Sequence, residues 1–187
     1  MARVIILNGV SSVGKTTLAK AVQAQSEGDM LRLSMDDFIS MVPLGREQAP
    51  DWFPVTVTRD GEDMLTDIRS GPEGKRLIAA MREFGGLLAD RQLDFVIDDV
   101  CTKAELDHWL DNLRSHEVML VKVEAPLEVI VAREKSRGDR MIGLARCQAR
   151  TLHEGIEYDL VIDTSALSPS EAAQSILCLL DERSRDV

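Results

Sequence analysis

One stretch near the start of the sequence carries the residues needed to hold phosphate groups. Residues 9–16 read Gly-Val-Ser-Ser-Val-Gly-Lys-Thr and match the pattern GxxxxGK[ST] at every fixed position. In this pattern the glycines let backbone N–H groups surround phosphates, the lysine reaches the β- and γ-phosphates, and the next hydroxyl can ligate Mg²⁺. An ordinary glycine turn with a solvated lysine is the alternative. The loop lies between an apolar run and a helical pattern, which favours phosphate binding.

This loop therefore predicts sites for two cofactors, ATP and Mg²⁺. Lys15 is expected to be catalytic as well as nucleotide-binding, and Thr16 is expected to be a metal ligand as well. The residues predicted to bind the nucleotide here are Gly9, Val10, Ser11, Ser12, Val13, Gly14, Lys15, Thr16 and Thr17.

Acidic residues follow two further apolar runs. Asp98 ends the run 93–97, in the manner of a Walker B acid, and is predicted to be a Mg²⁺ ligand, while a role for Asp99 stays open. Asp36 follows the run 31–35, where a carboxylate can take the proton of an acceptor hydroxyl. Asp37 is its rival, with the alternative role of N-cap for a helix beginning at Phe38. The residues alone leave these two acids hard to separate.

Three arginines flank a break in the helical pattern at 136–140. Arginines in a mobile segment over the phosphates would neutralise the charge of the transition state. We predict a lid over about 133–141, with Arg137 and Arg140 catalytic and Arg133 binding the nucleotide. The alternative is a solvated basic stretch. His153 is either catalytic or placed at a helix end, where its charge is favoured.

The composition excludes several classes of function. The formal net charge is -10, which argues against bulk nucleic-acid binding and against an anionic membrane surface. The three cysteines are widely spaced and form no CxxC pair, which indicates a reducing compartment. The apolar run 4–7 is too short for a signal peptide, and no run has the length of a membrane span. We therefore expect a cytoplasmic protein.

The elements that must position these residues alternate between short strands and helices. This order predicts an α/β fold with a parallel sheet covered on both faces, in a single domain over 1–187. The irregular stretch 43–70, with a short hairpin expected at 55–58, and the helix after it form a predicted acceptor-binding insertion over about 43–90. The expected strands are 3–7, 31–35, 93–97, 118–123 and 160–162. The expected helices are 14–25, 71–91, 102–113, 126–135, 141–153 and one that begins after Ser168 or Ser170 and ends near 183.

Several local sequences resemble those of the chloramphenicol phosphotransferase family. The resemblance runs from near residue 4 to about 165 and is weakest across 44–70. It is carried by 5–9, Ser11, Ser12, Gly14, Lys15, 97–100, 137–140, Gly143, Gln148, 153–155, 157–159, Asp163 and Thr164. It implies a P-loop kinase-like three-layer fold with a five-stranded parallel sheet, and it implies that Asp36 is the base.

The resemblance also implies the reaction. We expect an ATP-dependent phosphotransferase that moves the γ-phosphate to a hydroxyl of a small molecule, either a chloramphenicol-like antibiotic or a related compound. Antibiotic resistance is the corresponding biological role. One alternative is a kinase of a nucleoside, sugar or other metabolite. Another is a regulatory module that binds ATP without chemistry, although such a module needs no acid at Asp36. No nucleic-acid or membrane partner is expected.

Overall fold

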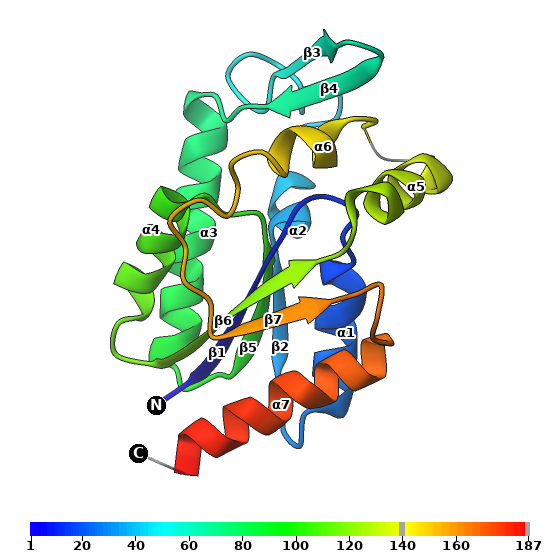
Figure 1. The fold of residues 1–187 in the computed structure, drawn as a ribbon. Helices are drawn as coiled ribbons and strands as arrows, with labels where there is room; N and C mark the ends of the chain where they lie inside the picture. The colour runs from blue at the N-terminus through cyan, green and yellow to red at the C-terminus, as the bar shows by residue number, and fades with distance from the viewer. Residues whose placement is uncertain (139–140, 186–187) are drawn as a thin grey trace.

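Five parallel strands form the centre of the molecule. The computed structural model describes residues 1–138 and 141–185, and within them the larger sheet has the order β2-β5-β1-β6-β7 (Figure 1). Every neighbouring pair in this sheet is parallel. The predicted α/β fold with a five-stranded parallel sheet is confirmed. The strands are β1 (Arg3–Asn8), β2 (Leu31–Ser34), β5 (Phe95–Asp99), β6 (Glu117–Glu124) and β7 (Leu160–Asp163).

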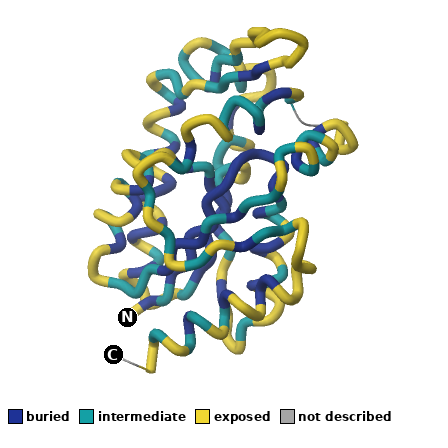
Figure 2. The backbone as a smooth tube through the Cα atoms, viewed as in Figure 1, coloured by how far each residue is buried: buried dark blue, intermediate teal, exposed yellow. Residues whose placement is uncertain are grey.

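Side chains on the two faces of this sheet enter two separate cores. In β1, Ile5 and Leu7 pack into the core shared with α1 (Lys15–Gln25) and α7 (Pro169–Arg185). Val4 and Ile6, which alternate with them, pack into the core shared with α3 (Pro72–Asp90) and α4 (Lys103–Leu113). Figure 2 shows the central strands as the most continuously buried part of the chain. The predicted three-layer arrangement follows from this alternation.

Helix α3 approaches α4 closely because α3 contains two consecutive glycines. A Cβ atom at Gly85 would lie 2.4 Å from Cζ3 of Trp109, and Trp109 is fully buried. Real Cβ atoms do not come that close to a ring, so only glycine fits at this position. Gly85 therefore marks the place where α3 packs against Trp109 of α4.

Two helix starts follow their predicted signals. Thr102 and Glu105 form the expected capping box at the start of α4. At the start of α7, the Ser168 hydroxyl donates to Glu171 at 2.6 Å, and the Glu171 N–H donates back at 3.3 Å. Of the two predicted cap residues for the last helix, Ser168 therefore makes the capping contacts.

The second strand ends earlier than its composition predicts. Strand β2 stops at Ser34, which is the N-cap residue of α2 (Met35–Ile39). Asp36 and Asp37 therefore both lie in the first turn of α2, where carboxylates are favoured by the helix dipole. The predicted role of Asp37 as N-cap of a helix beginning at Phe38 is wrong. Asp37 instead forms an exposed ion pair with Arg32, with 2.9 Å between nitrogen and oxygen.

A β-hairpin and a short helix lie over the carboxyl ends of the strands. The hairpin consists of β3 (Val55–Asp60) and β4 (Asp63–Ile68), and it is longer than the expected 55–58 hairpin. Helix α6 (Leu144–Gln148) packs beneath it (Figure 1). The Thr66 N–H donates to the carbonyl of Gly143 at 3.2 Å, and the Thr66 hydroxyl donates to the carbonyl of Ile142 at 2.6 Å. The hairpin and α6 therefore form one unit.

The helix predicted over 141–153 also differs from expectation. Helix α5 (Leu127–Arg137) ends at Gly138, which has the left-handed φ of 68° typical of a glycine C-cap. The helix predicted over 141–153 is reduced to α6, because Gly143 at φ 88° starts it and turns follow Gln148. Within the described ranges, none of the helices combines the length and the apolarity that crossing a membrane requires.

Candidate active site

A cavity of about 430 Å³ opens where the carboxyl ends of the strands face the hairpin and α6. Its walls include the 9–16 loop, the start of α2, the end of β5, part of the 43–54 loop, β4, α3 and α6. In open parallel sheets this edge is where ligands bind. The predicted site residues Ser11, Ser12, Gly14, Lys15, Thr16, Thr17, Asp36, Asp98 and Arg137 all line it.

The 9–16 loop has the tight backbone that a phosphate cradle needs. A Cβ atom at Gly9 would lie 2.4 Å from the carbonyl oxygen of Val123, so the loop can follow this path only with glycine there. Ser12 has a left-handed φ of 62°. Its hydroxyl is buried and has no hydrogen-bond partner within the described residues. A buried donor without a partner in a Gly-rich loop fits a phosphate oxygen.

Lys15 is held inside this loop. Its Nζ donates to the carbonyl oxygens of Gly9 at 2.8 Å and Val10 at 3.0 Å. Burial lowers the pKa of Lys15, while the carboxylates of Asp98, Asp99 and Asp36 act in the opposite direction. These three acids favour the ammonium form that phosphate binding requires.

Thr16 and Asp98 meet at the end of β5. The Thr16 hydroxyl donates to an Asp98 carboxylate oxygen at 2.6 Å, and Asp98 is buried. No group of three or more His, Cys, Asp or Glu side chains within the described residues could hold a metal ion alone. Mg²⁺ in phosphoryl-transfer sites takes only one or two protein oxygens and completes its shell with water and phosphate. A hydroxyl beside a carboxylate fits that requirement.

Asp99 makes a different set of contacts from its neighbour. Its carboxylate accepts hydrogen bonds from Trp109 Nε1 at 2.8 Å and Cys101 Sγ at 3.0 Å, and Arg82 lies 3.7 Å away. Burial, with Asp99 itself as the next cause, raises the pKa of the Cys101 thiol well above its usual range. Asp99 therefore joins the end of β5 to α3 and α4, and these contacts explain its burial without a ligand.

Asp36 and Asp37 are distinguished by which of them borders the cavity. Asp36 lines it together with Met35 and Ile39 and is near enough to Lys15 to influence its pKa. Asp37 does not line it, and its carboxylate is engaged with Arg32. The cavity lining thus distinguishes two acids that the residues alone leave hard to separate, and it agrees with the residue that the resemblance implies.

Gln148 contacts the phosphate loop directly, although no local pattern around it predicts this contact. Its Oε1 accepts a hydrogen bond from the backbone N–H of Ser11 at 2.7 Å, across 137 residues of sequence. Because Oε1 accepts this hydrogen bond, the Nε2 amide group of Gln148 keeps its N–H donors for other partners. Gln148 also lines the cavity. A glutamine within a resembling stretch carries no signal that marks this contact.

Arg133 holds the other side of the loop. Its guanidinium donates to the carbonyl of Val13 at 3.0 Å, the hydroxyl of Thr164 at 2.9 Å and the carbonyl of Thr164 at 2.9 Å. It lies beside a second hollow of about 320 Å³ between the loop and the start of α7. Exposed Arg137 lines both hollows. Arg140, predicted to be catalytic, lies outside the described residues.

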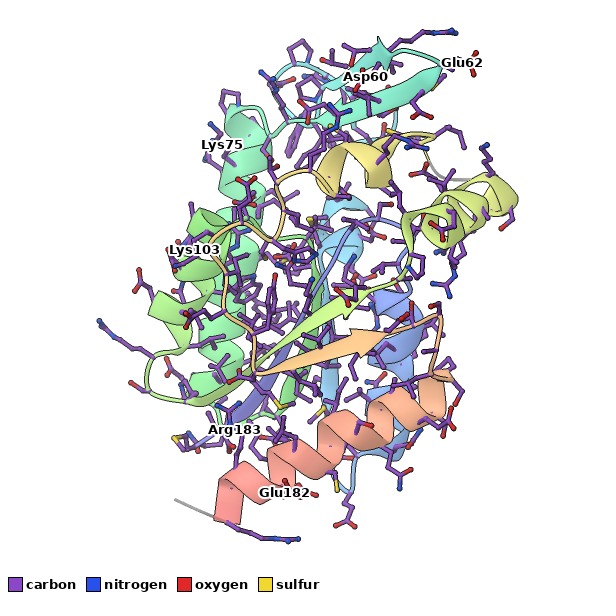
Figure 3. All side chains as sticks on the ribbon, viewed as in Figure 1. Asp60, Glu62, Lys75, Lys103, Glu182 and Arg183 are labelled. Atoms are coloured by element: carbon purple, nitrogen blue, oxygen red, sulfur yellow. The ribbon has the colours of Figure 1, made fainter. Side chains whose placement is uncertain are left out.

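Glu134, another residue without a sequence signal, positions α6. It is fully buried, and its carboxylate accepts the N–H groups of Gly143 at 2.7 Å and Ala145 at 3.0 Å. Side chains of the hairpin add exposed ion pairs to α6 and the turns after it. One pair joins Asp63 to Arg146. The other joins Asp60, at the end of β3 (Figure 3), to Arg150. The wall that carries Gln148 is therefore fixed from both sides.

His153 lies in a network behind the cavity wall. Its Nδ1 is 2.6 Å from the Tyr158 hydroxyl, which accepts a hydrogen bond from Asn8 Nδ2 at 2.9 Å. Burial lowers the pKa of His153 and raises that of Tyr158 to about 12. Neither ring lines the cavity. The network instead fixes Asn8, the residue before the phosphate loop.

Comparisons with solved structures agree with this architecture. A sugar kinase from Janibacter sp. HTCC2649 has a TM-score of 0.67 and 22% identity and covers 97% of this chain and 95% of its own. A tunicamycin resistance protein from Deinococcus radiodurans has a TM-score of 0.65 and 18% identity, covering 96% of each chain. The APS kinase of Mycobacterium tuberculosis has a TM-score of 0.67 and 15% identity, covering 96% of this chain and 98% of its own. At these identities the likeness establishes a P-loop kinase fold.

Sequence comparisons identify the family. Two relatives, from the CDC 1551 and H37Rv strains of Mycobacterium tuberculosis, carry the provisional name O-phosphotransferase. Each is 32% identical over 185 residues, which covers 93% of this chain and 80% of the relative. Residues 2–181 match the family described as chloramphenicol phosphotransferase-like protein. The chain therefore belongs to the chloramphenicol phosphotransferase-like family of P-loop phosphotransferases.

Proposed function

We propose that this phosphotransferase moves the γ-phosphate of ATP to a hydroxyl group of a small molecule, a chloramphenicol-like antibiotic or a related compound. One observation carries the proposal. A complete phosphate loop and a carboxylate that no metal site requires, Asp36, border the same cavity. A module that only binds ATP has no need of an acid on the far side of the phosphates.

The proposed nucleotide site uses both hollows. The amides of the 9–16 loop, the Ser12 hydroxyl and the Lys15 ammonium would bind the phosphates. The base would lie in the second hollow, between Arg133, Leu167 and Pro169. Arg133 already bonds the loop, so its proposed role is to hold Val13 and Thr164 in register for the nucleotide. Arg137 lines both hollows, which suits a residue that neutralises phosphate charge.

Thr16 and Asp98 are the proposed Mg²⁺ ligands. Bound there, Mg²⁺ would neutralise charge on the phosphate oxygens. The Thr16–Asp98 hydrogen bond of 2.6 Å keeps both oxygens together at the end of β5. The role of these two residues is to present preorganised oxygen ligands at the phosphate end of the cavity.

Asp36 is the proposed general base. Its carboxylate would accept the proton of the acceptor hydroxyl as that oxygen bonds to the γ-phosphorus and ADP departs. Gln148 would add a donor on the opposite wall, because its carbonyl oxygen is already held by Ser11. Phosphoryl transfer depends mainly on positioning and charge neutralisation, and these residues would supply both.

A screen for phosphate transfer tests this function. The protein, Mg²⁺ and γ-labelled ATP would be incubated with a panel of hydroxylated antibiotics, nucleosides, sugars and other metabolites. We expect the label to appear in a phosphate ester of the acceptor, whose hydroxyl group loses its proton in the transfer. Transfer to a nucleoside or sugar alone would favour the metabolite-kinase alternative. ATP binding with no ester from any acceptor would contradict the proposal and favour a regulatory module.

A further inference from the structure

Resting on the proposed function, we propose that the acceptor is a hydroxy compound that carries a protonated amine beside an apolar group. Carboxylated or phosphorylated alcohols are excluded as acceptors. The inference comes from three features of the cavity beyond the phosphate loop: the closed helix N-termini, the charges of the wall, and one half-buried carboxylate.

The helix N-termini around this part of the cavity offer no anion site. The first amides of α3 are occupied, since Glu73 and Gly74 donate to the carbonyl of Asp51 at 2.8 and 3.2 Å. The start of α4 is closed by Glu105, and the start of α6 by Glu134. The first turn of α2 carries its own acids, Asp36 and Asp37. A helix N-terminus attracts anions only through amides that are unsatisfied, so an acceptor anion finds none here.

Apart from two basic residues, the charged side chains described in the cavity wall are acidic. Among the described residues, the basic side chains that line the cavity are Lys15 and Arg137. Both have proposed roles with the phosphates. Apart from the proposed Mg²⁺ ligand Asp98, the acidic residues that line it are Asp36, Glu47, Asp67, Asp99 and Glu105. An anionic acceptor would be repelled by this wall, whereas an ammonium group would be attracted.

The other acids of this set have contacts within the described residues or a catalytic assignment, as shown above for Asp99, and Glu47 has neither. Asp67 pairs with Arg69 at 2.9 Å, and Glu105 accepts the Thr102 N–H at 2.9 Å. Glu47 is half-buried and borders the cavity, and its carboxylate makes no hydrogen bond or ion pair in the described part of the chain. Partial burial of an unpaired carboxylate is unfavourable, and a ligand ammonium would remove that cost.

Apolar residues beside Glu47 complete the site. The backbone N–H of Phe53 donates to the carbonyl of Glu47 at 3.0 Å, and Phe53 itself is buried. Phe53 lines the cavity together with Ile39, Ile68 and Ile78. An acceptor that fills this space would place an apolar group against these residues and its amine toward Glu47. Its hydroxyl would then extend to Asp36.

Three ligands with the same skeleton test the charge preference. The p-nitrophenyl amino-diol at the core of chloramphenicol would be used as the free amine, as the N-acetyl amide and as the N-succinyl amide, which are cationic, neutral and anionic. Affinity for the protein with Mg²⁺ and a non-hydrolysable ATP analogue would be measured by titration calorimetry at low and high salt. We expect the free amine to bind most tightly, the N-acetyl amide less tightly and the N-succinyl amide most weakly. The differences in affinity should be smaller at high salt.

Matched variants locate the effect. Glu47→Gln should weaken binding of the amine by roughly 5-fold and leave the acetyl amide unchanged, because one ion pair near solvent is lost. Glu62→Gln is the control, since Glu62 lies exposed at the hairpin turn (Figure 3) and outside the cavity wall. Tighter binding of the succinyl amide, equal affinities, or no binding of any of the three would overturn the inference.

Failure of this inference is distinguishable from failure of the proposed function. The proposed function fails if no alcohol receives the label of ATP. The inference alone fails if label is transferred but the acceptors found in the screen are predominantly neutral alcohols, carboxylates or phosphate esters.

Discussion

The two ends of the cavity are built in different ways. The phosphate end comes from one uninterrupted stretch between β1 and α1 and from Asp98 on the adjacent strand. The acceptor end is assembled from α2, the 43–54 loop, β4, the first turns of α3 and α6. A short contiguous motif thus encodes phosphate binding, whereas acceptor recognition is distributed along more than a hundred residues.

The two ends also differ in how their side chains are held. At the phosphate end, Lys15 at the start of α1 donates to two carbonyls of the loop, and Thr16 donates to Asp98 on β5. At the acceptor end, Asp36 and Glu47 are an exposed and a half-buried carboxylate on a short helix and a loop. The phosphate end is therefore built on α1 and a strand of the main sheet, whereas these two residues of the acceptor end lie on a short helix and a loop.

The largest effect is expected from removing the cation of the phosphate end. Lys15→Ala should lower kcat by about 10²–10³-fold, as losing one charged phosphate contact does in preorganised sites. It should also weaken ATP binding, measured by calorimetry. Lys20→Ala, on the exposed side of the same helix, is the control. Equal ATP affinity and turnover in wild type and Lys15→Ala would show that the loop is not a phosphate site.

A smaller effect is expected from the residue that joins the two ends. Gln148→Ala leaves the Ser11 N–H without its partner and removes a donor from the cavity wall. We expect kcat to fall by about 10-fold, with ATP affinity changed less than kcat. Exposed Gln25→Ala provides the baseline. If only the stability of the protein changes, Gln148 is structural and takes no part in transfer.

The packing of α3 should affect the acceptor end more than the phosphate end. Gly85→Ala places a Cβ 2.4 Å from the Trp109 ring, and such overpacking costs about 1–3 kcal/mol of unfolding free energy. Because Ile78 of α3 lines the cavity, KM for the acceptor should rise while the Kd of ATP stays constant. Gly28→Ala, where nothing lies within 4 Å, is the matched substitution. Chemical denaturation and steady-state kinetics measure both effects.

The smallest effect concerns pH. Burial lowers the pKa of His153 in the folded protein below the usual 6.5, so below that pH the unfolded chain takes up the proton first. Stability from this source is therefore unaffected above pH 6.5 and is lost as the pH falls toward the folded-state pKa. When the pH is lowered from about 7.5 to about 5.5, the free energy of unfolding measured by urea titration should fall less for His153→Gln than for wild type. Parallel curves would show that His153 is not responsible.

The sheet and the phosphate loop could be predicted because each has a local cause. The central strands β1 and β5 contain continuous apolar runs, and the loop is contiguous in sequence. The sequence predicts the hairpin only over 55–58 because the Val-Thr alternation stops at Thr58, and the exposed Arg59 and Asp60 that complete β3 are both polar. Because Met35 is apolar, it is expected at the end of the strand 31–35, yet it begins α2. The contacts of Gln148, Glu134 and Arg133 are tertiary, and no local pattern encodes them.

The central claim is that Asp36, at the acceptor end, is the general base of phosphoryl transfer. The most direct measurement compares kcat for transfer of γ-labelled phosphate by wild type, Asp36→Asn and Asp37→Asn, with ATP affinity measured alongside. The account predicts that Asp36→Asn folds, binds ATP and loses about 10²–10⁴-fold in kcat. Asp37→Asn should keep most activity, because Asp37 lies outside the cavity wall and pairs with Arg32. Reversed phenotypes, or full transfer by Asp36→Asn, would contradict the account.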